Sequence, residues 1–456
     1  MALNHSLKFF TVFFVLMLAA CCCPPNTQPA DLIFYNGDVI TMETDNPKAQ
    51  AIAILGDEIM ATGSDHDMLC KAGPNTIKIN LGGKTLVPGF IDSHAHWILD
   101  DNEKGFNSID EAMQYVVKNG WTSVNELFVR QEDLEVLQTL DNEGRIKVRV
   151  NAYMPVNYRD NYIGREYLLH DPLENFSSHV RIAGVKFVTD SYYGKDIYFT
   201  QQAFDAEIRA ADDQGWQVAI HSESIEALNM VLKSLGRVHN GWFNAHRHRI
   251  EHLLMMNDTQ LAEIRQKGYI ASIQLNLPGN FPEQDPDFYD HLDAVGFTDF
   301  DLIGRWKDLN DAGILIAGGS DWPWITNTTF IEQGGAPAGS PLRLIYKAAT
   351  HTNTADQTEA WMDGQYLTVA ESMKALTING AYATFEEDKK GSLAAGKWAD
   401  VVILSDNPIA VGKADIKAVR DIDVLMTMIG GKVEYCAAGA VDLCPQPVIT
   451  PTPRSP

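Results

Sequence analysis

The sequence predicts an α/β protein built on a parallel (β/α)₈ barrel, with a small β-sandwich formed by both chain ends. Between residues 86 and 323, eight strand-like segments alternate with helix-like segments, as expected for such a barrel. Before and after this region, short strands separated by glycine-containing turns indicate a second β-structure. An open doubly wound sheet is the rival fold, but no Gly-x-Gly-x-x-Gly pattern opens a helix after the first strand.

The first 30 residues are typical of an exported bacterial lipoprotein. Residues 1–20 contain a weakly basic start and the run FFTVFFVLMLAA, which is too short to span a bilayer and suits a signal peptide. Small residues precede Cys21, so we expect lipid on Cys21 and a flexible tether over residues 21–30. Cleavage of an ordinary signal near Ala20 is the alternative. We therefore expect a cell-envelope protein, on the outer membrane and facing the periplasm.

The distribution of strand-like segments divides the remaining chain into predicted domains. Strand-rich segments at both ends predict one composite β-sandwich, and the alternating middle predicts the barrel. The predicted parts are residues 31–85 and 385–435 for the sandwich, 86–384 for the barrel and 436–456 for a C-terminal tail.

Composition restricts the partners. Lys and Arg number 36 and Asp and Glu number 60, so the net charge is 36 − 60, or −24. Such a surface repels phosphates, which argues against nucleic acid as a partner. The charge says little about small molecules, and a small-molecule substrate is expected from the candidate site described below. No later segment is apolar and long enough for a transmembrane helix, so we expect membrane contact through the lipid. A homo-oligomer is compatible with this composition.

The cysteines fit an exported protein. Cys436 and Cys444 flank a short loop and could pair in an oxidising compartment. Cys70 lies among helix-forming residues and is expected to be a plain buried thiol. No Cys-x-x-Cys pattern is present, which argues against thiolate zinc sites and thioredoxin-like chemistry.

Polar side chains end five of the eight predicted barrel strands. Catalytic groups of such barrels lie at the C-terminal ends of the strands, and residues two apart on a strand share a face. The residues are His94 and His96 on the first predicted strand, Lys186 on the fourth, His221 on the fifth, His252 on the sixth and Asp321 on the eighth. Imidazole and carboxylate groups suit Zn²⁺ and similar ions, so this rim is a candidate metal site.

Each residue alone also has a structural interpretation. A His-x-His pair is weak evidence in a chain with 13 histidines, and His246 and His248 form a second pair. His221 and His252 could be hydrogen-bonded core histidines, and Asp321 could cap a helix. An inward lysine is harder to explain structurally, because lysines are rarely buried without a partner. The placement of all six candidate residues at one rim of the predicted barrel favours the metal site.

The sequence resembles the amidohydrolase superfamily, in particular the branch of N-substituted formamide deformylases. The segments VPGFIDSHAH, GVKFVTD, QVAIHSES, RHRIEH, GSDWP and GSLAAGKWADVVIL are similar, in order, to that branch's landmarks. The likeness covers most of residues 31–435 and implies a distorted (β/α)₈ barrel beside a small β-sandwich built from both termini.

The resemblance also implies a metal centre with two divalent ions, expected to be zinc. His94, His96 and Asp321 would hold the more buried ion, and His221 and His252 the more exposed one. Lys186, carboxylated by CO₂, would bridge both ions. Without carboxylation, a single ion held by the histidines and Asp321 is the alternative.

The implied reaction is hydrolysis of a C–N bond in an amide, formamide or cyclic amide by a hydroxide that bridges the metals. Asp321 would act as general base. Two alternatives remain: the same site could hydrolyse esters or dipeptides or run a non-hydrolytic metal reaction, or the chain could be a catalytically retired, surface-anchored binding protein. Relatives often carry Gly-Asp-Arg where this chain has Ser222–Ser224, so their substrates are not carried over.

Candidate substrate contacts follow the predicted strands at the same rim, where loops usually carry specificity. They are Tyr192, Tyr193, Gln274, Asn276 and Trp322. Their alternative role is to pack the loops against one another.

Overall fold

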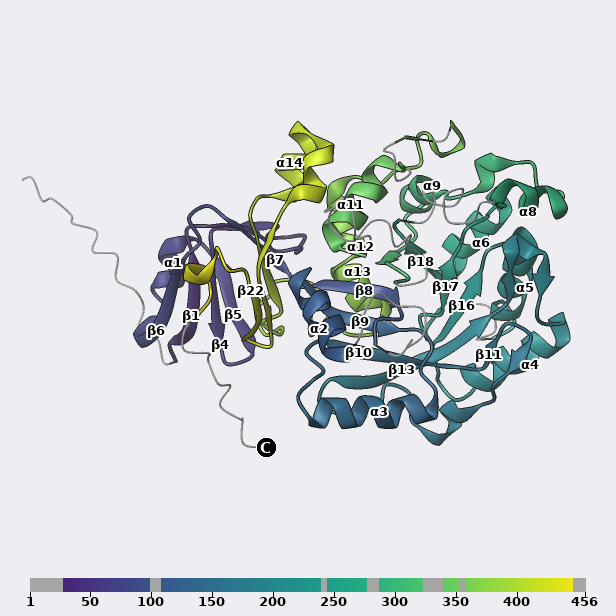
Figure 1. The fold of residues 1–456 in the computed structure, drawn as a ribbon, viewed down its shortest axis with the longest axis horizontal. Helices are drawn as coiled ribbons and strands as arrows, with labels where there is room; N and C mark the ends of the chain where they lie inside the picture. The colour runs from purple at the N-terminus through teal and green to yellow at the C-terminus, as the bar shows by residue number, and fades with distance from the viewer. Residues whose placement is uncertain are drawn as a thin grey trace, which may run out of the picture.

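The computed structural model contains an eight-stranded parallel sheet curved into a barrel and a separate β-domain beside it (Figure 1). In Figure 1 the β-domain lies on the left, and the barrel with its surrounding helices lies on the right. The structure describes residues 28–98, 108–238, 244–276, 287–322, 339–352, 357–358 and 360–445.

The barrel strands follow one another in chain order. They are β8 (Phe90–Ala95), β9 (Trp121–Glu126), β10 (Arg149–Pro155), β13 (Val180–Val188), β16 (Val218–Ser222), β17 (Arg249–His252), β18 (Ile270–Gln274) and β19 (Ile316–Gly319). Each strand pairs in parallel with the next in the order β8-β9-β10-β13-β16-β17-β18-β19. All eight predicted strands are present, which confirms the predicted fold class.

The barrel closes between β19 and β8 through backbone hydrogen bonds just beyond β19. The N–H of Asp321 donates to the carbonyl of His94 at 2.7 Å, and the N–H of His96 donates to the carbonyl of Trp322 at 2.8 Å. A Cβ on Gly319 would lie 2.7 Å from the backbone nitrogen of His94, closer than real Cβ contacts. Glycine is therefore required where these two strands meet.

Helices cover the outside of the barrel (Figure 1). They are α2 (Ile109–Lys118), α3 (Gln131–Asn142), α4 (Gln201–Asp212), α5 (Ile225–Leu235), α6 (Asp258–Lys267), α8 (Phe288–Ala294), α9 (Trp306–Asp311), α11 (Pro341–Thr350), α12 (Val369–Ala375) and α13 (Ile378–Ala383). The α5 helix begins where the side chain of Ser224 accepts a hydrogen bond from the N–H of Ala227. Phe187, on the outer face of β13, meets Phe204 of α4 edge to face, with ring centroids 5.8 Å apart.

Short elements complete the connections. They are α1 (Asp65–Leu69), α14 (Pro408–Ala414), β11 (Asn157–Tyr158), β12 (Asn161–Tyr162), β14 (Asp190–Ser191), β15 (Asp196–Ile197) and the 3₁₀ turns η1 (Glu166–Leu169), η2 (Tyr192–Gly194), η5 (Phe300–Leu302), η6 (Ala360–Met362), η7 (Ile416–Asp421) and η8 (Val441–Leu443). No helix in the described ranges is long and apolar enough to cross a membrane.

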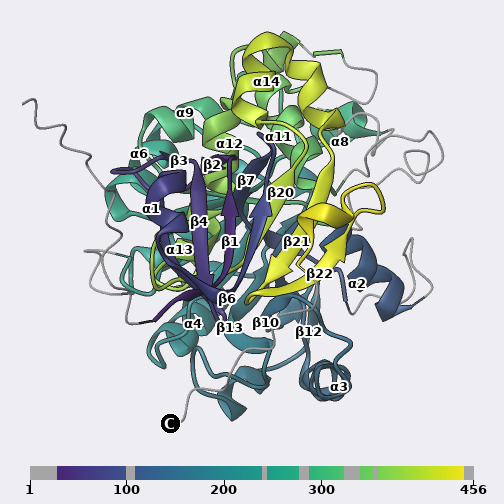
Figure 2. The ribbon, with the colours of Figure 1, turned by 90° about the vertical axis from the view of Figure 1, so that its left-hand side faces the viewer.

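The β-domain consists of two sheets, and strands from both chain ends share one of them (Figure 2). The strands are β1 (Ala30–Tyr35), β2 (Asp38–Ile40), β3 (Lys48–Ala49), β4 (Ala51–Leu55), β5 (Glu58–Gly63), β6 (Ala72–Asn80), β7 (Thr85–Pro88), β20 (Val401–Leu404), β21 (Val424–Ile429) and β22 (Lys432–Cys436). The sheet orders are β5-β4-β1-β6 and β22-β21-β20-β7-β2-β3. Phe34 and Ile54 of the first sheet and Ile403 and Met428 of the second belong to one apolar core.

The cysteines of the described chain are oxidised. Cys436 and Cys444 form a disulfide that links the end of β22 to the residue after η8. Cys70, expected to be a plain buried thiol, is instead half-buried, because it caps the C-terminal end of the short α1 helix, and it is disulfide-bonded. Cys21, the signal segment and the last residues of the tail lie outside the described residues.

A buried ion pair joins the barrel to the β-domain. Arg149 of β10 binds Asp400, which precedes β20, with Nε–Oδ2 and Nη2–Oδ1 distances of 2.8 and 3.0 Å. The guanidinium lies 3.7 Å from the ring centroid of Trp398, and the N–H of Gly430 donates to Asp400 Oδ1 at 2.8 Å. The pair is thus held by charge, hydrogen bonds and stacking at once.

We expect Asp400→Ala to lower the free energy of unfolding by about 3 kcal/mol, because it leaves the largely buried Arg149 without its anion. Denaturant unfolding measures this change. The control is Asp110→Ala, which removes an exposed pair with Arg145 (Nε–Oδ1 3.0 Å) and should leave the midpoint unchanged. Equal shifts for both variants would contradict a structural role for the Arg149–Asp400 pair.

Candidate metal centre

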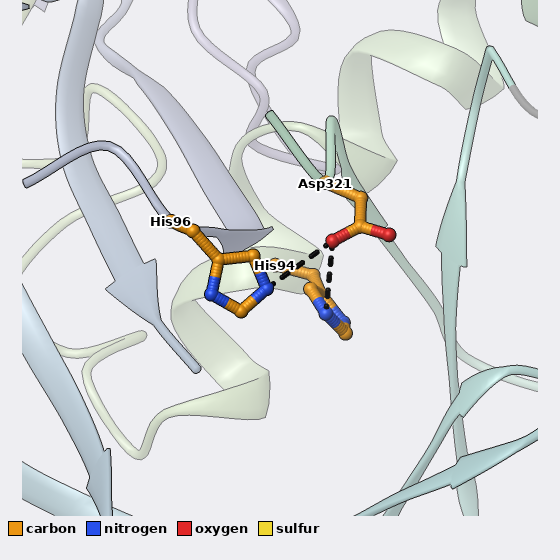
Figure 3. A group of neighbouring side chains, drawn as sticks. All are labelled: His94, His96 and Asp321. Atoms are coloured by element: carbon orange, nitrogen blue, oxygen red, sulfur yellow. Dashed lines mark ion pairs between the residues drawn. The ribbon is translucent and has the colours of Figure 1, made fainter. Parts of the chain in front are cut away.

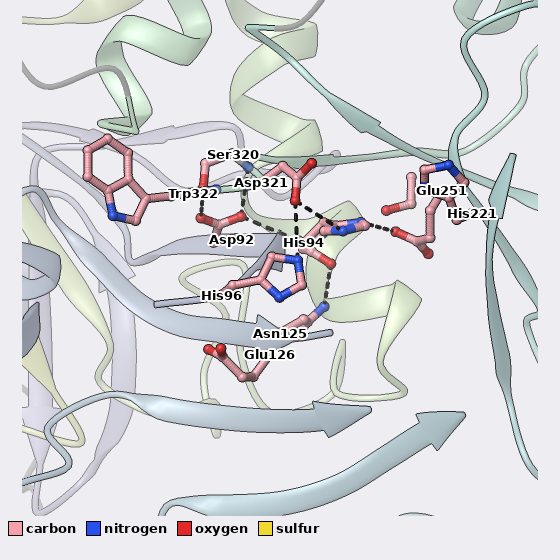
Figure 4. A network of polar contacts seen from close by, with 12 residues as sticks. Asp92, His94, His96, Asn125, Glu126, His221, Glu251, Ser320, Asp321 and Trp322 are labelled. Atoms are coloured by element: carbon pink, nitrogen blue, oxygen red, sulfur yellow. Dashed lines mark hydrogen bonds and ion pairs between the residues drawn. The ribbon is translucent and has the colours of Figure 1, made fainter. Parts of the chain in front are cut away.

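Five barrel strands bring the six sequence-predicted polar residues together at the C-terminal rim. Figure 4 shows His94, His96, His221 and Asp321 of this group. The imidazole rings form a continuous group: the centroids of His94 and His252 lie 4.9 Å apart, and those of His221 and His252 lie 4.3 Å apart. His96 adjoins His94, with ring centroids 5.6 Å apart. Lys186 and Asp321 are close enough to influence the pKa values of the ring nitrogens electrostatically. The site therefore assembles from residues that are far apart in sequence.

One carboxylate oxygen faces two of these imidazoles (Figure 3). Oδ1 of Asp321 lies 3.4 Å from Nε2 of His94 and 3.3 Å from Nε2 of His96. Ligand atoms of all three residues lie within 4.8 Å of one another, a spacing that a single metal ion can bridge. The barrel closure creates this group, since it fixes Asp321 beside the backbone of His94.

Two site residues adopt a left-handed backbone conformation. His252 has φ 67° and Asp321 has φ 53°. Non-glycine residues rarely occupy this region, and such strained positions concentrate at functional sites. At the end of β17, the left-handed turn changes the direction in which the side chain of His252 points. Arg249 and Glu251 bond to groups inside the barrel, Ile250 packs in the main core outside it, and the turn at His252 brings its ring into the rim.

The second half of the group contains buried polar atoms without hydrogen-bond partners among the described residues. These atoms are Nζ of Lys186 and Nε2 of His221. Burial lowers the pKa of Lys186 to about 8 and the pKa of His252 to about 3. Burial, reinforced by the charge of Lys186, also lowers the pKa of His221 well below its ordinary value. Neutral imidazoles with unshared electron pairs are what a metal ion binds, so these residues fit such an ion.

The groups that hold His94 in place could not be recognised from the sequence alone. Nδ1 of His94 lies 2.6 Å from Oε2 of the fully buried Glu251, which in turn accepts a hydrogen bond from Arg249 Nη2 at 2.9 Å. Arg249 also donates to Ser272 Oγ at 2.6 Å and to the Ser93 carbonyl. Because Glu251 accepts the Nδ1 proton, Nε2 of His94 is left as the atom that faces Asp321. In the segment RIEH, alternate residues share a face of the strand, and this pattern was the sequence signal that could have identified Glu251 as an inward-facing residue.

Asp92 also supports the site, in a way that the sequence did not reveal. Its carboxylate accepts hydrogen bonds from the N–H and hydroxyl of Ser320 and from the indole N–H of Trp97. Burial raises the pKa of Asp92 to about 6. These bonds tie β8 to the residue before Asp321 (Figure 4), so Asp92 positions ligand candidates from both sides of the barrel closure.

The predicted substrate contacts occupy different environments. Trp322 is buried and stacks on Trp97 and Tyr115, with centroids 5.2 and 5.8 Å apart. Tyr193 packs edge to face on Phe288, with centroids 5.3 Å apart. Both side chains thus contribute to aromatic packing. The side chain of Tyr192 lies outside the described part of the structure.

Two predicted contacts end the seventh barrel strand, β18. Asn276 donates from Nδ2 to the carbonyl of Ser320 at 3.3 Å and so braces the loop before Asp321. Gln274 is 1% exposed, and neither atom of its amide has a partner among the described residues.

The second His-x-His pair lies at the opposite end of the barrel. His246 Nδ1 and His248 Nε2 lie 2.7 and 3.0 Å from Oδ1 of Asp212. Nδ1 of His248 accepts a hydrogen bond from the N–H of Val218, at the start of β16, at 3.1 Å. His248 therefore carries its proton on Nε2 and offers no electron pair to an ion. These three residues brace α4 against the start of β17.

Comparisons with known proteins agree with this architecture. The sequence pattern of the amidohydrolase family matches residues 98–435. Amidohydrolase YtcJ of Bacillus subtilis is 25% identical over 353 residues, which cover 72% of this chain and 61% of YtcJ. N-substituted formamide deformylase of Arthrobacter pascens is 39% identical over 70 residues, or 15% of this chain and 13% of that protein.

Among solved structures, an uncharacterised metal-dependent hydrolase from Pyrococcus horikoshii resembles the fold with a TM-score of 0.66 and 16% identity, over 84% of this chain and 99% of that one. The chain spans less than two thirds of YtcJ, whereas the solved structure is covered almost completely.

The two His-x-His pairs give a matched test. We expect His94→Ala to reduce the zinc bound per chain, because it removes a candidate ligand, and Asp212→Asn to leave bound zinc unchanged. Asp212→Asn should instead lower the free energy of unfolding by about 1–3 kcal/mol, because it weakens the buried hydrogen bond to His248 and the half-buried one to His246. Metal analysis of purified protein and denaturant unfolding measure these effects. Zinc loss from a folded Asp212→Asn protein would contradict the assignment.

Proposed function

Because the chain belongs to the amidohydrolase family, whose pattern covers residues 98–435, we propose that it is a metal-dependent hydrolase. The bond we assign is the C–N bond of an amide, formamide or cyclic amide. The observation that carries this proposal is the pair of buried nitrogen atoms, Nζ of Lys186 and Nε2 of His221, that have no hydrogen-bond partner among the described residues and lie beside the His94–His96–Asp321 group. Around Nε2 of His221, the carboxylate oxygens of Asp190 and Glu223 lie 3.7 Å away, too far for a hydrogen bond. The names of the relatives, an amidohydrolase and a formamide deformylase, support the same bond type.

The donor atoms suggest two divalent ions, with zinc as the best match for imidazole and carboxylate ligands. His94, His96 and Asp321 would hold the more buried ion. His221 and His252 would hold the second, because their rings adjoin each other and the first group. Glu251 supports this arrangement, since a carboxylate behind a ligating histidine fixes its tautomer and raises its basicity.

Lys186 would bridge the two ions as a carbamate. Its lowered pKa makes neutral amine available near neutral pH, and a neutral Nζ can attack CO₂. The ammonium group first loses one proton. The neutral amine then forms a C–N bond to CO₂ as one C–O π bond breaks, and a second proton leaves the nitrogen, so that a cation becomes an anion with two oxygen donors. This change would also remove the energetic penalty of an unpaired buried ammonium group. Without the carbamate, the three-residue group around Asp321 would hold one ion.

Ions bound here would supply hydroxide at neutral pH and polarise the substrate carbonyl. The residues of the chain would do the rest. Asp321 would accept the proton of the attacking oxygen on its carboxylate and return it to the departing nitrogen, so that the amine leaves uncharged. The Glu251–His94 hydrogen bond keeps the imidazole oriented during this transfer. The buried setting of both groups strengthens their electrostatic effects on the reacting atoms.

We expect chelation to abolish activity and Zn²⁺ to restore it, on a panel of N-acyl, N-formyl and cyclic amides with matched esters and dipeptides. Lys186→Ala should bind at most half the metal of the native protein and lose on the order of 10²–10³-fold in kcat. The control is Lys390→Ala. Lys390 is equally buried but lies 2.6 Å from Glu386, so its loss should lower stability and not metal content.

Unchanged metal content and turnover in Lys186→Ala would contradict the bridged centre. Stoichiometric ligand binding without turnover by the native, metal-loaded protein would favour a binding protein instead of an enzyme.

We also propose that the chain is exported and anchored by lipid on Cys21. The disulfide between Cys436 and Cys444 supports an oxidising compartment. We expect Cys21→Ser to move the protein from the membrane fraction to the soluble fraction and to abolish labelling with radioactive palmitate. Cys22→Ser, one residue away, is the matched control and should remain membrane-bound and labelled. Labelled, membrane-bound Cys21→Ser protein would contradict the anchor.

A further inference from the structure

Gln274 is a buried amide at the barrel rim that the proposed ligand set does not use. It ends β18, is 1% exposed, and neither Oε1 nor Nε2 has a hydrogen-bond partner among the described residues. Leaving a buried amide unpaired costs about 1–3 kcal/mol. A buried side chain with this energetic cost is a candidate for a group that forms its hydrogen bonds only when another molecule binds.

The backbone shows where this amide points. Ser272, two residues earlier on the same face, accepts a hydrogen bond from Arg249 inside the barrel, whereas Ile273 packs in the main core outside it. Gln274 therefore faces inward. Its backbone partner on β19 is Gly319, whose missing Cβ would touch His94. The amide thus lies between the strand that ends in His252 and the loop that carries Asp321.

Gln217 shows what a structural glutamine looks like in the same barrel. It is 3% exposed, and both ends of its amide are bonded. Oε1 accepts from the Tyr153 hydroxyl at 2.6 Å, and Nε2 donates to the carbonyls of Arg247 and Ala383 at 2.7 and 2.8 Å. Gln274 has the same burial and none of these bonds, so packing alone does not account for a polar side chain at this position.

We propose that Gln274 is a specificity-determining residue that recognises the N–H of the bond to be cleaved. This inference rests on the proposed hydrolase function. Oε1 accepts the substrate N–H, and Nε2 donates to an oxygen atom of the same substrate. Esters and N,N-disubstituted amides have no N–H, so they leave Oε1 buried and unpaired. The site then selects secondary amides, including formamides and lactams, over their ester counterparts.

The substrate-free protein gives a test that needs no activity. Gln274→Met replaces an unpaired amide with an apolar chain of similar volume, so the thermal midpoint of the metal-loaded protein should stay equal or rise by a few degrees. Gln217→Met, the matched control, removes bonded atoms and should lower the midpoint by several degrees. A fall in Gln274→Met as large as that in Gln217→Met would show that Gln274 has a structural partner, and would overturn the proposal.

The second test compares a secondary amide with its ester and its N-methyl amide, which share the same acyl group. We expect Gln274→Met to lower the amide-to-ester ratio of kcat/KM by about 100-fold, and the secondary-to-tertiary amide ratio similarly. Unchanged ratios, or loss of bound metal from the variant, would overturn the proposal. If the native protein hydrolyses none of these substrates, the function proposed above fails, while the thermal comparison still decides whether Gln274 is unpartnered.

Discussion

The closure of the barrel between β19 and β8 is the constraint on which the rim depends. Two backbone hydrogen bonds join the strand ends, and Gly319 permits the approach that places Asp321 between His94 and His96. Asp92 locks the same junction from the side through Ser320. Side chains more than 200 residues apart in sequence thus meet with little freedom, as a metal site requires. The left-handed backbone at Asp321 is strain that this closure sustains.

Burial and charge together explain why the rim suits cations. Arg249 is neutralised by Glu251 and satisfied by neighbouring oxygens, so this buried ion pair beneath the rim is fully bonded. Above it, burial lowers the pKa values of His221 and His252, and the buried nitrogens of Lys186 and His221 have no hydrogen-bond partner among the described residues. A folded chain tolerates such penalties where a bound group removes them. The contrast between the satisfied lower layer and the unsatisfied rim is the main argument for bound metal.

The alternation of inward-facing and outward-facing side chains along the strands, together with the turn residues, predicted much of the fold from the sequence. The eight strands, and the placement of Lys186 and His221 at strand ends, follow from a period of two residues. The two-residue alternation of side chains could not reveal that a left-handed turn directs His252 into the site. A positive φ at a non-glycine residue arises from tertiary structure. The alternation also could not predict the Glu251–His94 bond or the stacking of Trp322, which depend on which strands and loops become neighbours around the barrel.

A rim that holds two metal ions should be visible in a crystal structure of the zinc-loaded protein with anomalous data collected on both sides of the zinc absorption edge. We expect one anomalous peak among His94, His96 and Asp321, a second beside His221 and His252, and carbamate density on Lys186. Absence of zinc peaks at the rim, or a sole peak at the Asp212–His246–His248 cluster, would contradict the two-ion centre.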